Sequence, residues 1–266
     1  MKNRNLLIIT FICCIVSLSG CWDHIELDQR EFIIAVGLDR GVNSGEVILT
    51  LQSIIPSQVK SSMRNGSSGQ EQAVRVISTH GGSISEALKS YKQLTDHQPY
   101  LQNNRLLIIS QELAREGIGP LVDFFVRNPG SKTRAWVLIS KGKAGDILHW
   151  QSDDHQVPAD FIDDMLHNQN FITTMVAEDL NNFTVKLTGG ITEPSTAGIE
   201  IVAGKIGQPP QVRIAGTAVF TGDKLAGWLD ERETNGLLWI MGKFGKGMVN
   251  INIPGQKPRN VTIQID

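Results

Sequence analysis

Short apolar runs bounded by turn residues alternate with helical patterns along most of this chain. Strand-like runs occupy residues 32–38, 46–55, 73–78, 105–110 and 133–140. Alternation of this kind is typical of a mixed sheet with helices packed on it. We therefore predict an α+β fold: a mixed-sheet N-terminal domain with covering helices over residues 21–205, then the beginning of a second α+β domain over residues 211–266.

The first 21 residues have the three parts of a bacterial lipoprotein signal peptide. Lys2 and Arg4 form a positive n-region, Leu6 to Leu18 an apolar core, and small residues precede Cys21. The apolar core is shorter than the roughly 20 residues that a transmembrane helix needs. Residues 1–20 are thus predicted to be a signal peptide, with the mature chain beginning at Cys21. An ordinary secretory signal with a chance cysteine is the alternative.

The sequence Leu-Ser-Gly-Cys resembles the lipobox of secreted bacterial lipoproteins. That resemblance implies S-diacylglycerol and N-acyl groups on Cys21, holding the chain to a membrane. Each buried methylene contributes roughly 0.8 kcal/mol, so two or more acyl chains give stable attachment.

Composition narrows the classes of function. Cys13 and Cys14 lie in the expected leader, so the mature chain keeps only Cys21, and an intramolecular disulfide or a Cys-ligated zinc is excluded. The chain has 25 basic and 27 acidic residues, a formal net charge of −2. No basic footprint suggests nucleic acid as a partner.

A glycine-rich turn at residues 80–86 admits two interpretations. Backbone amides at the start of the helix that follows would attract an anion. Alternatively, Ser83 and Glu86 have the spacing of a capping box. The capping interpretation is favoured, because neither a P-loop nor a dinucleotide fingerprint is present.

Metal-ligand chemistry could be assembled only near residues 153–167. Asp160, Asp163, Asp164 and His167 fall on one face of a helix that Pro158 opens. Together they could hold a divalent cation. Alternatively, the same four residues form the solvated face of an amphipathic helix, and this interpretation is favoured. We therefore predict no metal, with these four residues as the candidates if one binds.

None of the searched catalytic motifs is present. The sequence has no Gly-x-Ser-x-Gly elbow, no His-Glu-x-x-His and no Ser-x-x-Lys beside its partner motifs. An enzyme is not expected, and neither is a cofactor.

Three blocks of sequence resemble the Ger(x)C lipoproteins, the C subunits of spore germinant receptors. The first block is Leu18 to Asp23 with Val36-Gly37-Leu38-Asp39, and the second is Gln111 to Ile118 with Trp136-Val137 and Lys141 to Ala144. The third block is Gly216 to Phe220 with Asp223 to Leu229 and Glu233 to Leu237. Two departures are a polar stretch at Pro99 to Asn104 and an end at Asp266, in a strand without later partners. The second departure leads us to expect C-terminal truncation.

The resemblance implies a lipid-anchored subunit on the outer face of the cell membrane or the inner spore membrane. It would act with two integral-membrane receptor subunits in nutrient-triggered germination, through non-catalytic assembly or coupling. One alternative is a lipid-anchored solute-binding protein of an uptake system, which predicts two comparable lobes around a cleft. A weaker one is a metal-dependent cell-envelope hydrolase that uses the four candidate ligands.

Overall fold

The computed structural model describes most of the chain after residue 28. The described residues are 4, 29–54, 74–128, 130–151, 157–167, 175–204, 207, 209–244, 247–252 and 260–265, the last two ranges by their backbone alone. The chain divides into two units, Met1–Arg30 and Glu31–Asp266, and the fold below is that of the second. Cys21, the expected leader apart from Arg4, and the polar stretch from 57 to 72 lie outside the described residues.

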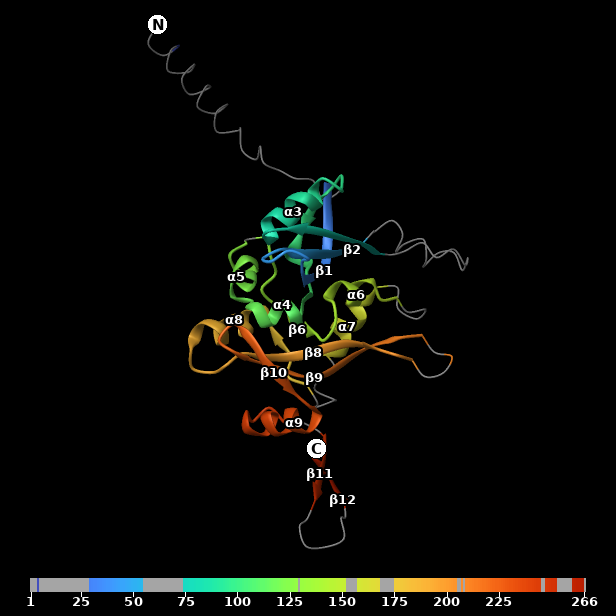
Figure 1. Cartoon of the computed structure of the whole chain (residues 1–266), viewed down its shortest axis with the longest axis vertical. Coiled ribbons are helices and arrows are strands. Elements are labelled where there is room, and N and C mark those ends of the chain that lie inside the picture. Colours follow the sequence, from blue (N-terminus) through green and yellow to red (C-terminus); the bar gives the residue numbers. More distant parts are fainter. Residues whose placement is uncertain are drawn as a thin grey trace. The chain divides into compact units, whose positions relative to one another are not determined.

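One mixed sheet contains most of the strands (Figure 1). Its order is β10-β9-β8-β6-β5-β1-β2-β3, with β4 beside β1 and β7 beside β6. The central pairs β1–β5, β5–β6 and β6–β8 are parallel, and the outer pairs are antiparallel. The strands are β1 (Arg30–Arg40), β2 (Val47–Ile54), β3 (Val74–Gly81), β4 (Gln98–Tyr100), β5 (Leu106–Ser110), β6 (Trp136–Ser140), β7 (Glu178–Asp179), β8 (Ser195–Val202), β9 (Gln211–Thr221) and β10 (Lys224–Leu229).

Helices cover both faces of this sheet, as Figure 1 shows. The helices α3, α4, α5 and α8 share one buried core with the sheet, and α6 and α7 share the other. The prediction of a mixed sheet with covering helices is therefore confirmed. The helices are α3 (Ile84–Lys92), α4 (Gln111–Glu116), α5 (Gly119–Arg127), α6 (Ala144–His149), α7 (Pro158–His167), α8 (Leu180–Gly189) and α9 (Glu231–Ile240), with a 3-10 turn at Leu101–Asn103.

The strand β5 shows how the sequence builds two cores at once. Leu107 and Ile109 lie in the core under α3, α4, α5 and α8, while Leu106 and Ile108 lie in the core under α6 and α7. Successive side chains of a strand point to opposite faces, so a continuous apolar run is what a doubly covered central strand requires.

The strands β9 and β10 extend the same sheet. β9 pairs with β8 from Val202↔Gln211 to Ser195↔Val219. Val212 is buried in one core and Phe220 in the other. The separate hairpin of β11 (Gly247–Asn252) and β12 (Asn260–Ile265) forms a sheet of its own.

Two element ends are set by local contacts. The helix α8 begins at Leu180, because the Asp179 carboxylate accepts a hydrogen bond from the Asn182 amide at 2.7 Å and so caps the helix there. The turn expected at His80 begins later, because β3 pairs with β2 as far as Gly81. A Cβ atom on Gly81 would lie 2.5 Å from the Ala87 nitrogen, so only glycine fits between this strand end and α3.

Candidate functional site

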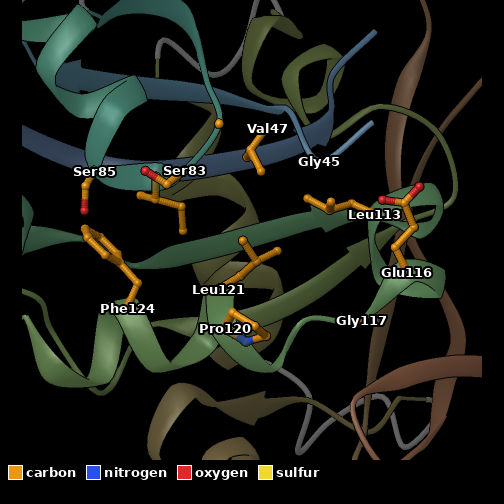
Figure 2. A pocket seen from close by; sticks show the side chains of 12 residues that line it. Gly45, Val47, Ser83, Ser85, Leu113, Glu116, Gly117, Pro120, Leu121 and Phe124 are labelled. Atoms are coloured by element: carbon orange, nitrogen blue, oxygen red, sulfur yellow. The ribbon is translucent and has the colours of Figure 1, made fainter. Parts of the chain in front are cut away.

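A groove lies between α3 and α5, on the face of the sheet that α3, α4, α5 and α8 cover. Figure 2 shows Pro120, Leu121 and Phe124 of α5 facing Ser83 and Ser85 of α3. The cavity has a volume of about 390 Å³. Its other lining residues come from the β1–β2 turn, the start of α3 and helix α4: Gly45, Val47, Gly82, Ile84, Leu113, Glu116 and Gly117.

The α3 side of the groove is fixed by a helix cap. The Ser83 hydroxyl oxygen accepts a hydrogen bond from the Glu86 amide at 3.2 Å, as a capping residue does. The Glu86 carboxylate turns back and accepts from the Gly82 amide at 2.9 Å. The predicted cap is thus confirmed, although the reciprocal bond goes to Gly82 rather than to Ser83. An anion at this turn would compete with the Glu86 carboxylate, which argues against the anion-binding interpretation.

The α5 side is positioned by the turn between β9 and β10. The Asp223 backbone oxygen accepts from the Ile118 amide at 2.9 Å, and its carboxylate accepts from the Gly119 amide at 3.2 Å. Gly117 has φ of +124°, and a Cβ there would lie 2.9 Å from the Asp223 carboxylate. Glycine is therefore required at Gly117 both for its backbone angle and for the close approach.

An ion pair marks one rim of the groove. Arg40 Nε lies 2.6 Å from Glu116 Oε1, and both side chains are about half exposed, at 47% and 43%. The rest of the lining is mainly apolar. Such a surface is suited to receiving apolar side chains.

The four metal candidates all lie on α7, and three of them make hydrogen bonds or ion pairs. Asp160 Oδ1 is 2.9 Å from Arg105 Nη1, and Asp163 accepts a hydrogen bond from the Trp136 indole at 3.0 Å. His167 Nδ1 lies 2.9 Å from the Asp163 backbone oxygen, and Asp164 is exposed. Burial raises the pKa of Asp160 above its ordinary value, although Arg105 offsets part of this effect. Among the described residues, no group of three or more His, Cys, Asp or Glu side chains could hold a metal ion.

Two polar residues that attach α6 and α7 to the sheet were not predicted from the sequence. The Asp39 carboxylate accepts from the amides of Ala144 and Gly145 at 2.7 and 2.8 Å, at the first turn of α6. Gln52, fully buried on β2, donates to the Leu148 backbone oxygen at 2.8 Å and accepts from the Ala159 amide at 3.3 Å. Polar residues inside apolar strand runs were the available signal, because buried polar groups need partners.

Comparison with known proteins places the chain in a family. The family profile described as spore germination protein N-terminal domain matches residues 23–201, and the one described as spore germination B3/GerAC like, C-terminal, matches residues 215–266. The first profile alone covers more than half of the chain. The chain therefore belongs to the GerAC-like spore germination proteins.

Relatives from Bacillus subtilis (strain 168) agree with this. The chain is 27% identical to spore germination protein KC, over 100% of this chain and 68% of that protein. It is 24% identical to the putative spore germination protein YfkR, over 94% of this chain and 64% of that protein. It is also 28% identical to spore germination protein A3, over 71% of this chain and 48% of that protein. The chain thus spans about two thirds of the length of the first two relatives.

Among solved structures, the crystal structure of the GerBC protein matches 83% of this chain and 59% of that chain, with 16% identity and a TM-score of 0.42. Within the described part of the chain, no helix is long and apolar enough to cross a membrane.

Proposed function

We propose that this chain is a lipid-anchored subunit of a spore germinant receptor, attached through acyl groups on Cys21 and acting with two integral-membrane subunits. Membership of the germination family supports the role, and the leader pattern that ends in Cys21 supports the anchor. The role is assembly or coupling and not catalysis. The observation that carries this part is the α3–α5 groove, whose lining is mainly apolar and whose Ser83 hydroxyl is used as a helix cap.

We further propose that the groove receives apolar side chains of one of the membrane-embedded subunits. Its two walls are held by separate parts of the chain, the α3 wall by the Ser83 cap and the α5 wall by Asp223. Two fixed walls keep the apolar surface open without a partner in place, and such preorganisation lowers the entropic cost of binding.

The rival function as a solute-binding protein has less support. It predicts two comparable lobes around a cleft, whereas the described strands from β1 to β10 form one continuous sheet. The groove lies on one face of that sheet and not between two lobes.

Two variants test the proposal. Cys21→Ala should abolish acyl labelling and move the protein out of the detergent phase, because the acyl chains are its strong membrane attachment. Leu121→Asp should leave acylation intact but remove co-purification with the two membrane subunits and slow nutrient-triggered germination. The control is Val185→Asp on α8, where the side chain is 61% exposed and outside the groove. Unchanged acyl labelling in Cys21→Ala would refute the anchor, and normal co-purification of Leu121→Asp would refute the groove as the contact surface.

A further inference from the structure

The stretch of chain that joins Cys21 to the first strand is short. Glu31, the second residue of β1, is the tenth residue after Cys21. A fully extended chain spans at most about 3.5 Å per residue, so Glu31 can lie no more than about 35 Å from the lipid-modified residue. This step rests on the proposed acylation of Cys21.

Several elements meet at this end of β1. Phe32 makes an edge-to-face contact with Tyr100 of β4, with ring centroids 5.9 Å apart. Arg75, at the start of β3, lies 3.7 Å from the Glu31 carboxylate. Tyr91, in the last turn of α3, is buried, and burial together with the nearby Glu31 charge raises its pKa. The last turn of α3 therefore lies at the end of the sheet where β1 begins.

The surface of this turn is basic and partly apolar. Lys89 and Lys92 are exposed, and within the described part of the chain neither ammonium group has an ion-pair partner. Both line a second cavity of about 390 Å³ whose walls include Pro99, Leu101 and Phe124. Leu94, just after α3, is 62% exposed.

The acidic groups nearby are few and engaged. Asp96 lies 2.6 Å from the ring of His97. Glu86, earlier in α3, caps the start of the helix through the Gly82 amide. Two lysines beside an exposed leucine, at the end of the sheet where β1 begins, are suited to contact with anionic lipid.

We propose that Lys89, Lys92 and Leu94, called here the α3 membrane surface, lie against an anionic bilayer. The two ammonium groups contact lipid phosphates, and Leu94 enters the interfacial layer. This second attachment fixes the orientation of the sheet on the membrane, which one flexible tether cannot do.

Acetylation of lysines in the vesicle-bound protein tests this proposal without any substitution in the α3 membrane surface. The chain from residue 21 onward has only one cysteine, Cys21, which can be coupled to a maleimide lipid in preformed vesicles. Acetylation of individual lysines by an amine-reactive ester is then followed by mass spectrometry on vesicles of phosphatidylcholine, with and without phosphatidylglycerol. The exposed Lys143, just before α6, and Lys224, at the start of β10, serve as internal controls.

We expect Lys89 and Lys92 to react about 5-fold more slowly on the anionic vesicles, since each lysine near such a surface gains about 1 kcal/mol. The controls should react equally on both vesicles, and high salt should remove the difference. Because the maleimide supplies the anchor, this result does not depend on whether cells acylate Cys21.

Two outcomes overturn the proposal. One is equal reaction of Lys89 and Lys92 on both kinds of vesicle. The other is protection of these lysines only in native membranes that contain the receptor subunits, because the surface would then be a protein contact. Failure of acylation in cells is a separate result, read from acyl labelling of Cys21.

Discussion

The helices on the two faces of the sheet are attached in different ways. On the face of α6 and α7, buried or partly buried polar side chains reach across the interface: Asp39 to the start of α6, Gln52 to α6 and α7, and Arg105 and Trp136 to the aspartates of α7. Hydrogen bonds of this kind have fixed geometry, so they set the position of a helix as well as its stability.

The face of α3, α4, α5 and α8 is held mainly by apolar packing. Ile84, Ala87, Val122, Phe125 and Phe183 are all buried there. One polar contact here is the hydrogen bond that the Thr79 hydroxyl of β3 donates to the Ala87 backbone oxygen of α3, at 2.9 Å. Both cavities discussed above open on this face. The polar contacts that position the two walls of the first cavity are local ones, the Ser83 cap of α3 and the hydrogen bond from the Gly119 amide to Asp223.

The largest effect is expected where apolar packing is complete. Phe183 of α8 is fully buried, and its ring lies edge-to-face with Phe220 of β9 at 5.4 Å. Phe183→Ala should lower the free energy of unfolding by about 4 kcal/mol, measured by urea denaturation. The exposed neighbour Val185→Ala should change it by less than about 0.5 kcal/mol. A loss below about 1 kcal/mol for Phe183→Ala would show that α8 is not a fixed part of this core.

A somewhat smaller effect is expected from the polar attachment of α6. Asp39→Ala leaves the buried amides of Ala144 and Gly145 without an acceptor, and we expect a loss of about 3 kcal/mol. The matched control is Asp146→Ala, an exposed aspartate in the first turn of the same helix. If the two variants were equally stable, Asp39 would contribute only as a negative charge near the helix start.

Substitutions of the α7 aspartates distinguish a structural role from metal binding. Asp163→Ala removes the acceptor of the Trp136 indole and should cost about 1.5 kcal/mol, whereas the exposed Asp164→Ala should cost almost nothing. The difference in unfolding free energy between these two variants should be the same in EDTA as in zinc, manganese or calcium. Stabilisation of the unchanged chain by one of these metals, lost in both variants, would favour the metal interpretation.

Local sequence patterns identified most elements because their determinants are local. The apolar run of β5 and the Ser83 cap of α3 need only a few neighbouring residues, and both are present as predicted. The groove was missed because its walls come from segments far apart in the chain, such as Val47, Ser83 and Leu121. The role of Asp39 could not be predicted, because its hydrogen-bond partners lie more than a hundred residues later in the chain.

The α7 helix shows the limit of periodicity. The spacing of Asp160, Asp163, Asp164 and His167 correctly placed these residues on one helix. It did not reveal that Arg105 and Trp136 lie opposite two of them. A face that looks solvated in sequence is therefore partly an interface with the strands β5 and β6.

The smallest predicted effect is on the pH dependence of stability, to which Asp39 and Glu200 should contribute with opposite signs. Burial raises the pKa of Asp39, although hydrogen bonds from Gly145 and Ala144 offset part of the effect. The folded state then binds this proton more tightly than the unfolded state, so stability increases as the pH falls through the range just above the ordinary value of 3.8. Glu200 of β8 differs. Its burial alone would raise the pKa, but Arg213 and Lys141 lower it below the ordinary value of 4.5.

Glu200 therefore stabilises the fold above pH 4.5, and this contribution is lost as the pH falls through the lowered pKa. Compared with the unchanged chain, Asp39→Asn should become relatively less stable on acidification, and Glu200→Gln relatively more stable. Each change in the free energy of unfolding should be small, below about 1 kcal/mol. Urea denaturation at a series of pH values between neutral and about 4 measures both. If acidification changed the relative stability of both variants in the same direction, the opposite pKa shifts inferred for Asp39 and Glu200 would be wrong.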